Sequence, residues 1–299
     1  MALTLAHLSD VHLGPLPKGA AWNNFAMKRI VGTLSWKLNR HKLHDPAISR
    51  ALVEDIKAAG PEHVAFTGDL VNVSAHAEFP RAMRWLQNFG DPSWISFVPG
   101  NHDAYVHVPW GQGLGHLAPY MTGDMAAGAS LFPYVRLRRN LAIIGLNSAS
   151  PQSLTRAAGT LGPEQLEILP EILRDLKAKG YYRALMIHHP PLPGLAPARK
   201  ALTDAPRLRT ILAREGAELI LHGHNHQQMV NILEGPDGRI PIIGTPSASL
   251  TGHGHYESAA WNLYEITRNQ GVWMTEVSTR GWDPISRRMV NKNQFMLPS

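Results

Sequence analysis

The 299-residue sequence predicts an α/β fold with two β-sheets, and two observations carry this prediction. As far as Met229, short apolar runs rich in β-branched residues alternate with helical patterns. After Met229 the helical patterns stop, and strand-like runs joined by glycine-containing turns follow. The alternation indicates an α/β protein. The closing meander indicates a second, more antiparallel sheet.

The expected strands of the alternating region are short, apolar and followed by polar residues. They are Leu3–Leu8, His63–Phe66, Trp94–Val98, Leu141–Leu146, Ala184–Ile187 and Glu218–Leu221. The expected helices follow proline or polar start signals and cover Ala47–Ala59, His76–Phe89, Pro163–Lys179 and Pro206–Glu215. The meander is expected to contain Met229–Leu233, Ile240–Ile243, Ala260–Ile266 and Val272–Val277.

The chain shows no fixed-period repeat and no long linker, so we expect a single domain over residues 1–281. Two pieces look irregular in sequence. One is a helical, cap-like insertion at residues 15–44, and the other is a C-terminal tail at residues 282–299.

Composition limits the chemistry that the chain can perform. The absence of cysteine excludes disulfides, iron–sulfur clusters and thiolate ligands, so any metal must be held by nitrogen and oxygen. The start lacks a signal-peptide pattern and no run reaches the ~20 apolar residues of a membrane helix, so we expect a cytoplasmic protein. The net charge of +6 favours anionic partners but is too scattered to predict specific nucleic-acid binding.

Polar clusters follow five of the expected strands. They are Ser9-Asp10-Val11-His12, Gly68-Asp69, Gly100-Asn101-His102-Asp103, His188-His189-Pro190-Pro191 and Gly223-His224-Asn225-His226. The carboxyl ends of strands in an open α/β sheet are where loops converge and sites form. Aspartate, histidine and asparagine suit hard or borderline divalent ions such as Mn²⁺, Fe and Zn²⁺. The clusters therefore predict a metal site.

The number of candidate ligands exceeds what one tetrahedral ion uses. The candidates are Asp10, His12, Asp69, Asn101, His188, His224 and His226. They satisfy two ions if one carboxylate bridges, and we choose Asp69 for the bridge. The glycines before Asp69, Asn101 and His224 fit a backbone that must turn sharply and approach a crowded centre.

Simpler explanations exist for each cluster alone, since aspartate, asparagine and histidine are ordinary turn and cap residues. Five such turns in this order are not explained that way. Two choices remain within the set. Gly252-His253-Gly254-His255 repeats the pattern of Gly223–His226, and we prefer the latter because it directly follows a strand. His188 and His189 would face opposite sides of a continuing strand, and we choose His188.

These clusters, in this order, resemble the calcineurin-like metallophosphoesterase superfamily, whose pattern is D-x-H, G-D, G-N-H-[DE], H, G-H-x-H. The resemblance spans Ala6 to His226 and is strongest to class III cyclic-nucleotide and glycerophosphodiester phosphodiesterases. It implies a four-layer αββα sandwich of two mixed sheets flanked by helices. It also implies two divalent transition-metal ions, Mn or Fe or else Zn, one on Asp10, His12, Asp69 and His226 and one on Asp69, Asn101, His188 and His224.

The implied activity is hydrolysis of a phosphodiester, with 3′,5′-cyclic nucleotides or small glycerophosphodiesters as expected substrates. Two ions ~3.5–4 Å apart would activate a bridging water and neutralise the phosphate. By the resemblance His102 is the catalytic histidine, placed to give a proton to the leaving group. Asp103 would fix the tautomer of His102 or, equally, be a solvated turn carboxylate.

Other functions within the superfamily stay open, among them a pyrophosphohydrolase of lipid-linked UDP-sugars. A reading of a different class is a non-catalytic scaffold with this fold. The complete set of candidate ligands argues against the scaffold.

The insertion at residues 15–44 departs from the short connection that the superfamily has here. On a helix its apolar residues Trp22, Ala26, Ile30, Leu34 and Leu38 recur every four residues beside a basic rim, and Phe25, Met27 and Val31 widen the apolar face. We expect this face to be buried against its own domain or a second subunit of a homo-oligomer. The alternative is peripheral contact of residues 22–42 with an anionic membrane surface. Because the insertion starts just after His12, we expect it to border the active-site mouth.

Overall fold

The structure is a computed structural model that describes residues 2–18, 27–124, 131–252 and 256–298. Its strands form two six-stranded mixed sheets. In spatial order, sheet 1 contains β12 (Arg288–Met296), β11 (Val272–Asp283), β10 (Ala260–Asn269), β1 (Leu3–Leu8), β2 (His63–Phe66) and β3 (Ile95–Phe97). Sheet 2 contains β4 (Tyr134–Arg138), β5 (Leu141–Gly145), β6 (Tyr182–Met186), β7 (Leu219–His222), β9 (Arg239–Gly244) and β8 (Met229–Glu234).

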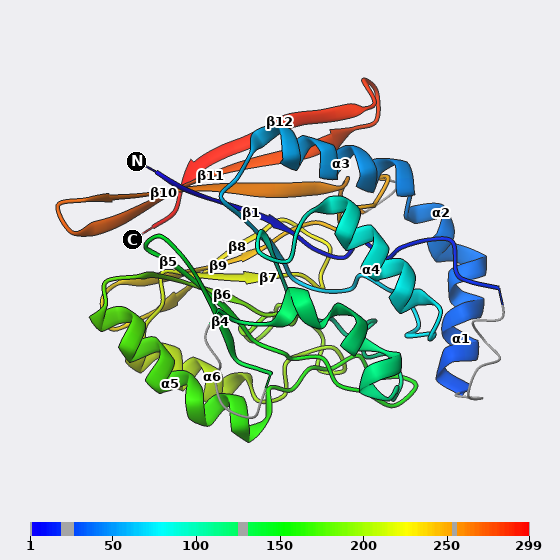
Figure 1. The fold of residues 1–299 in the computed structure, drawn as a ribbon, viewed down its shortest axis with the longest axis horizontal. Coiled ribbons are helices and arrows are strands. Elements are labelled where there is room, and N and C mark those ends of the chain that lie inside the picture. Colours follow the sequence, from blue (N-terminus) through cyan, green and yellow to red (C-terminus); the bar gives the residue numbers. More distant parts are fainter. Residues whose placement is uncertain (1, 19–26, 125–130, 253–255, 299) are drawn as a thin grey trace.

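Helices cover the outer face of each sheet, so the predicted αββα sandwich is confirmed (Figure 1). On the side of sheet 1 lie α3 (Pro46–Ala59) and α4 (Glu78–Phe89), and on the side of sheet 2 lie α5 (Gly162–Ala178) and α6 (Ala205–Glu215). Short 3₁₀ helices at Trp110–Gln112 and Leu114–Met121 connect β3 to sheet 2. The start of α3 follows local rules: Asp45 accepts a hydrogen bond from the Ala47 N–H (2.7 Å), and Pro46 occupies the first turn.

The hydrophobic core has two layers because successive strand residues point to opposite faces. In β5, Ile143 packs between the two sheets, whereas Ile144 packs outward with Leu169 of α5 and Leu212 of α6. The central parallel strands are therefore buried on both faces, which is why they appear in the sequence as continuous apolar runs.

The late strands do not form a sheet of their own, and that part of the sequence prediction is wrong. β9 pairs parallel to β7 and antiparallel to β8 in sheet 2, while β10 pairs antiparallel to β1 in sheet 1. The reason is that, without the late strands, β1 and β7 would be edge strands with unpaired N–H and C=O groups. The late strands are shared between the sheets: β9 and β8 are added beside β7, and β10, β11 and β12 are added beside β1.

The C-terminal tail is also regular, contrary to expectation. β12 pairs antiparallel to β11, so residues 288–296 extend sheet 1 instead of lying outside the domain. β12 is an edge strand, and most of its side chains are exposed. Because most of its residues are polar, β12 does not form the apolar run by which strands are recognised in a sequence. β4, which pairs antiparallel to β5, also escaped the sequence analysis.

The insertion folds as α1 (Met27–Ser35), a π-helical turn at Trp36–Arg40 and α2 (His41–Leu43). Trp22, Phe25 and Ala26 of its predicted apolar face lie outside the described residues. Within the described part, Ile30 is partly buried, but the rest of the apolar face is exposed: Met27 66%, Val31 43%, Leu34 53% and Leu38 66%. Burial of these side chains in their own domain was therefore a wrong expectation.

The opposite face of the same helix packs onto the domain, and it is polar. Arg29 is fully buried and donates hydrogen bonds to the carbonyls of Val73 (3.2 Å) and Ser74 (2.7 Å). Gly32 lies so close to Tyr105 that an added Cβ would be 2.8 Å from the phenol oxygen. Hydrogen bonds from Arg29 and the close approach at Gly32 thus orient α1 in place of a hydrophobic face.

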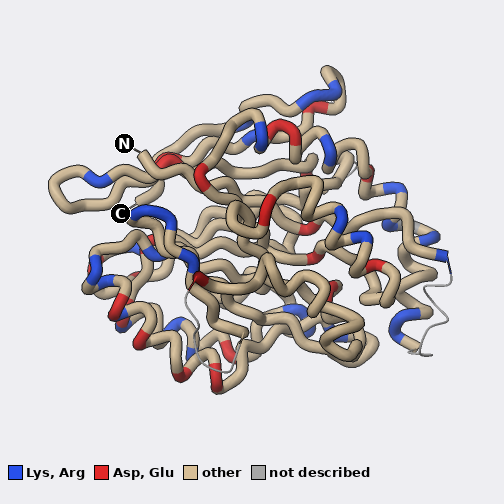
Figure 2. Tube along the Cα trace, in the orientation of Figure 1, with Lys and Arg blue, Asp and Glu red and all other residues tan. Residues whose placement is uncertain are grey.

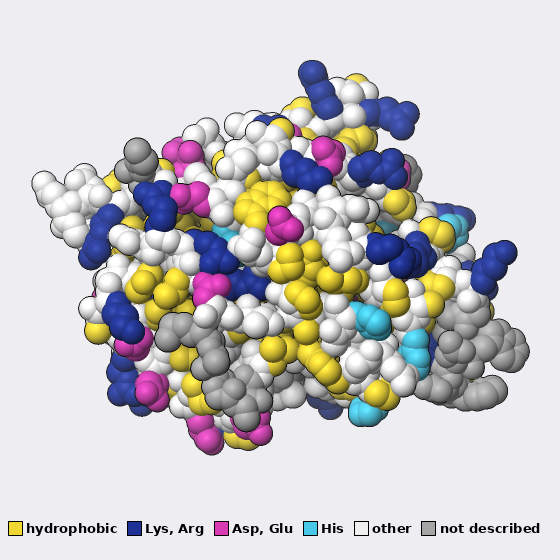
Figure 3. All heavy atoms as spheres, viewed as in Figure 1, with side chains coloured by type: hydrophobic (Ala, Val, Ile, Leu, Met, Phe, Trp, Pro, Cys, Tyr) yellow, Lys and Arg dark blue, Asp and Glu magenta, His cyan; other side chains and the backbone are white. Residues whose placement is uncertain are grey.

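Charge on the molecule is spread out. Between Asp10 and Asp45 the sequence has no acidic residue, and the backbone trace around α1 carries only basic ones (Figure 2). On the face shown in Figure 3, basic side chains are scattered among acidic, polar and apolar ones instead of gathering in one patch.

Candidate metal centre

The five polar clusters meet where the two sheets present the carboxyl ends of their parallel strands. β1, β2 and β3 are parallel neighbours in sheet 1, and β6 and β7 are parallel neighbours in sheet 2. The loops that leave these strands supply every candidate ligand: Asp10, His12, Asp69, Asn101, His188, His224 and His226. The structure brings all seven together.

One group of ligand atoms comes from the loops after β1 and β7. His226 Nε2 lies 3.1 Å from Asp10 Oδ1 and 3.3 Å from His12 Nε2. His12 Nε2 lies 3.8 Å from Oδ2 of Asp69. The ligand atoms of Asp10, His12 and His226 all lie within 4.8 Å of one another, as they would around a single ion.

A second group lies on the other side of Asp69. His188 Nε2 is 3.5 Å from Asp69 Oδ2 and 3.1 Å from Asn101 Oδ1, and His224 Nδ1 is 2.8 Å from the same asparagine oxygen. Asp69 Oδ2 therefore faces His12 and His188, one histidine from each group. This is the position that a bridging carboxylate requires.

The donor set fits divalent cations. Asp10 Oδ1, a ligand atom of the first group, is buried without a hydrogen-bond partner, although buried polar atoms are costly when they are left unpaired. Burial alone would lower the pKa of His188, but the carboxylates of Asp69 and Asp10 raise it to about 9. Cations would satisfy the Asp10 oxygen and replace the proton on His188.

Backbone strain is concentrated in the same loops. Five candidate ligands adopt left-handed backbone conformations, with positive φ angles at Asp10 (56°), His12 (48°), Asp69 (57°), His224 (70°) and His226 (56°). Such conformations are unfavourable for residues with a Cβ and persist where the surrounding fold enforces them, often at functional sites. Here they turn each side chain back toward the strand ends.

Two glycines permit the close approach of the loops after β2 and β3. A Cβ added to Gly68, which has φ +94°, would lie 2.6 Å from the Gly100 nitrogen. A Cβ on Gly100 would overlap Asp69 Oδ1. The expectation that these glycines serve geometry is confirmed.

Asp103 serves a structural purpose that the sequence did not reveal. Its carboxylate is buried and accepts four backbone hydrogen bonds, from the N–H groups of Asp69 (2.7 Å), Leu70 (3.0 Å), Val71 (2.9 Å) and Gly100 (2.8 Å). It is therefore neither a solvated turn carboxylate nor the group that fixes the His102 tautomer. Asp103 ties the loop after β3 to the loop after β2 and so positions Asp69.

We expect Asp103→Ala to destabilise the protein by roughly 2–4 kcal/mol, because it leaves several buried N–H groups without an acceptor. Asp103→Asn keeps one acceptor oxygen and should have a smaller effect. Urea unfolding followed by circular dichroism measures both, with the exposed Asp91→Ala as control. Equal stability of Asp103→Ala and Asp91→Ala would show that the four hydrogen bonds are unimportant.

His102 is fixed through one ring nitrogen and leaves the other free. Its Nδ1 lies 2.6 Å from the Asn72 carbonyl, so this nitrogen carries the proton and donates it. The ring stacks on Tyr105, with centroids 5.3 Å apart, and meets His12 edge-on at 4.9 Å. Burial and the nearby Arg40 guanidinium lower the pKa of His102 to about 4.

The sequence left two choices, between His188 and His189 and between Gly223–His226 and Gly252–His255, and the geometry bears on both. His188 faces Asp69 and Asn101, whereas the ring nitrogens of His189 contact Ser148 Oγ (2.8 Å) and the Ala157 carbonyl (3.1 Å). His189 thus has hydrogen-bond partners away from Asp69, although one of its ring nitrogens also lies within 4.8 Å of ligand atoms of His188 and His224. Gly223–His226 lies in the centre, and His253, Gly254 and His255 fall outside the described residues.

Two residues of the insertion reach the centre and were not identified as site residues from the sequence. Arg40 Nη2 lies 3.1 Å from His12 Nδ1, and the His44 ring lies 4.7 Å from the His12 ring. The insertion therefore borders the metal centre, as predicted. A signal was present: Arg29, Trp36 and Arg40 recur at helical spacing opposite the apolar stripe.

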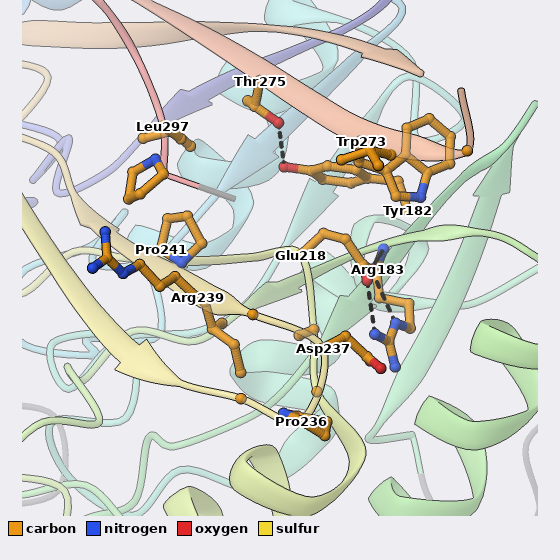
Figure 4. A pocket seen from close by; sticks show the side chains of 18 residues that line it. Tyr182, Arg183, Glu218, Pro236, Asp237, Arg239, Pro241, Trp273, Thr275 and Leu297 are labelled. Carbon is orange, nitrogen blue, oxygen red and sulfur yellow. Dashed lines mark hydrogen bonds and ion pairs between the residues drawn. The ribbon is translucent and has the colours of Figure 1, made fainter. Parts of the chain in front are cut away.

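A separate cavity of about 260 Å³ lies at the other end of the strands (Figure 4). Four of its polar side chains form two pairs, Tyr182 with Thr275 (2.8 Å) and Arg183 with Glu218 (2.7 Å). Tyr182 begins β6, whereas His188 follows the end of that strand. The cavity is therefore distinct from the metal centre.

Fold and site together define a metallophosphoesterase. Residues 3–228 match the family Calcineurin-like phosphoesterase, which is most of the chain, and the protein belongs to that family. It is thus a metal-dependent phosphoesterase, as the sequence resemblance implies.

Relatives agree with this assignment. The chain is 24% identical over 280 residues to a probable cyclic nucleotide phosphodiesterase from Synechococcus sp., covering 93% of this chain and 92% of that protein. Its fold is similar to a dimetal phosphatase from Danio rerio (TM-score 0.64, 13% identity, 99% and 98% of the two chains). It is also similar to a purple acid phosphatase from Lupinus luteus (TM-score 0.58, 11% identity, 100% of this chain and 54% of the other).

Among the described residues, every helix is too short or too polar to span a bilayer.

Proposed function

We propose that the protein is a dinuclear metal-dependent phosphodiesterase. The observation that carries the proposal is the position of Asp69 Oδ2, 3.8 Å from His12 Nε2 and 3.5 Å from His188 Nε2, between two sets of nitrogen and oxygen ligands. Asp10, His12 and His226 would hold one ion with Asp69. Asn101, His188 and His224 would hold the other. The similarity to a probable cyclic nucleotide phosphodiesterase supports a diester substrate.

Two divalent ions, Mn or Fe or else Zn, would supply a deprotonated water at neutral pH and positive charge toward the phosphoryl oxygens. Protonation of the leaving group must come from a side chain of the protein. The Asn72 carbonyl holds the Nδ1 proton of His102, so Nε2 is the atom that faces the leaving oxygen. Because Nε2 is unprotonated in the neutral ring, it must first take up a proton, such as the one released by the attacking water, before it can give one to the leaving oxygen. Asp103 keeps Asp69 and the His102 loop in register through its backbone hydrogen bonds.

Substrates are proposed to be 3′,5′-cyclic nucleotides or small glycerophosphodiesters. The test is a panel with added Mn²⁺ that contains both classes, single-stranded nucleic acid, UDP-diacylglucosamine and a phosphomonoester. We expect kcat/KM to be highest for a small diester, with Asp69→Ala as the inactive control. A preference for the lipid-linked UDP-sugar would favour the pyrophosphohydrolase alternative. Failure to turn over any compound would favour the scaffold.

The exposed stripe of Met27, Val31, Leu34 and Leu38 is where we place a contact with a second subunit or with an anionic membrane surface. The subunit contact and the membrane contact are both predictions, and so is a cytoplasmic location. Light scattering after size exclusion tests the subunit contact, and co-sedimentation with phosphatidylglycerol vesicles tests the membrane contact. A dimer that Leu34→Glu dissociates would establish the subunit contact. Vesicle binding that Lys37→Glu with Lys42→Glu abolishes would establish the membrane contact.

A further inference from the structure

The Arg40 guanidinium lies directly against the candidate metal centre. Its Nη2 is 3.1 Å from His12 Nδ1 and 3.4 Å from His12 Nε2, so it lies close to both nitrogens of that ring, and its Nη1 is 3.4 Å from His102 Nδ1. Among the described residues, no Asp or Glu forms an ion pair with it within 4 Å. The carboxylates of Asp69 and Asp10 attract Arg40 only from beyond ion-pair distance, while burial lowers its pKa. A cationic group in such a largely desolvated position is costly, and its presence needs an explanation.

The neighbouring imidazoles cannot satisfy Arg40 once the centre is loaded. With Nε2 of His12 bound to an ion, the neutral ring carries its proton on Nδ1 and has no lone pair there to accept from Arg40. His102 Nδ1 already donates its proton to the Asn72 carbonyl (2.6 Å), so it cannot accept either. The Nη1 and Nη2 groups are thus donors without an acceptor.

The chain holds Arg40 in this position through packed neighbours. Trp36 is 3% exposed and stacks on the His44 ring, with centroids 5.8 Å apart, and a Cβ on Gly14 would lie 2.9 Å from the Trp36 indole. His44 is itself held by Ser249 Oγ (2.7 Å). A π-helical turn such as Trp36–Arg40 re-aims side chains and is frequent at functional sites. Arg40 is therefore pre-organised.

Charge at the loaded centre favours an anion beside Arg40. Two divalent ions would bring four positive charges, and the carboxylates of Asp10 and Asp69 carry two negative charges, so the net charge would be +2. Arg40 raises this net charge to +3. A phosphoryl group supplies negative charge, and its oxygens match the planar fork of a guanidinium. Arg40 is also beside His102, on the side where the leaving group is proposed to depart.

We propose that Arg40 is a substrate-binding residue that donates hydrogen bonds to a non-bridging phosphoryl oxygen of the substrate. This inference rests on the proposed function and adds a recognition group supplied by the insertion. Arg40 would neutralise phosphate charge in addition to the ions, and the insertion thereby takes part in phosphate recognition rather than only covering the site.

The test measures phosphate binding apart from turnover. Inorganic phosphate is titrated into the Mn²⁺-loaded protein by calorimetry, for the wild type, Arg40→Met and Arg40→Lys. Lys37→Met, an exposed cation of the same turn, is the matched control. Metal content and thermal unfolding are recorded for every variant.

We expect Arg40→Met to retain its metals and to bind phosphate roughly 10–100-fold more weakly, as for the loss of a charged hydrogen bond. Arg40→Lys should recover part of this loss, since an ammonium keeps the charge but lacks the fork. Lys37→Met should match the wild type. For active substrates, kcat/KM should fall in the same order.

Three results would overturn the inference. They are unchanged phosphate affinity in Arg40→Met, metal loss in that variant that accounts for its weaker binding, and a wild-type protein that loads metal but does not bind phosphate. If the wild type binds phosphate through Arg40 but hydrolyses no diester, the proposed function fails while the assignment of Arg40 stands.

Discussion

Asp69→Ala should lose both metal ions and reduce phosphodiester hydrolysis to background. Asp69 Oδ2 lies within 3.8 Å of His12 Nε2 and 3.5 Å of His188 Nε2, so its removal takes a ligand from both ions at once. Substitutions of groups that merely orient metal ligands weaken metal affinity roughly 10–100-fold, and the loss of a shared ligand should exceed that. Metal content by plasma mass spectrometry, together with kcat/KM, measures the effect.

His226→Ala is the matched comparison for this experiment. His226 is partly exposed and contacts Asp10 and His12 of one group only. Its removal should mainly weaken one ion and leave the other bound. An Asp69→Ala protein that keeps two ions and full activity would disprove the bridging assignment, and so would a His226→Ala protein that loses both ions as readily.

His102→Ala should keep its metals but lower turnover by roughly 10²–10⁴-fold, as for a lost general acid or base. Metal retention is expected because the contact of residue 102 with Asp69 Oδ1 (2.7 Å) comes from its backbone N–H, which alanine preserves. The effect should be small for a nitrophenyl diester, whose leaving group departs without a proton. It should be large for a nucleoside or glycerol leaving group.

The comparison of the two leaving groups decides what His102 does. Rates for both substrates are measured under single-turnover conditions, so that product release does not mask the chemical step. His116→Ala, which removes an exposed histidine of the 3₁₀ helix Leu114–Met121, controls for nonspecific disturbance. Equal impairment on both substrates would rule out proton donation and assign His102 to positioning of the phosphate.

The candidate site was predictable because its residues sit at the ends of recognisable strands. Asp10, Asp69 and His188 each follow a short apolar run, and the parallel order of strands brings such ends to one edge. The four helices with proline or polar start signals were predictable for a similar reason, since local rules determine them. Neither inference needs knowledge of distant contacts.

The remaining features depend on contacts that no local pattern encodes. β12 is polar because it is an exposed edge strand, so it resembles a tail in sequence. The helix of the insertion exposes Leu34 and Leu38 and buries Arg29, because the free carbonyls of Val73 and Ser74 lie beneath it. Likewise, the sequence around Asp103 indicates only a turn residue, because the four N–H groups that its carboxylate binds come together only in the folded chain.

The central claim is tested most directly by locating the metals themselves. Crystals of the Mn²⁺-loaded protein, with diffraction recorded on both sides of the manganese absorption edge, would show the ions through their anomalous scattering. We predict two peaks roughly 3.5–4 Å apart with the Asp69 carboxylate between them, one beside His12 and His226 and the other beside His188 and His224. A single peak, or peaks that Asp69 does not contact, would contradict a dinuclear centre.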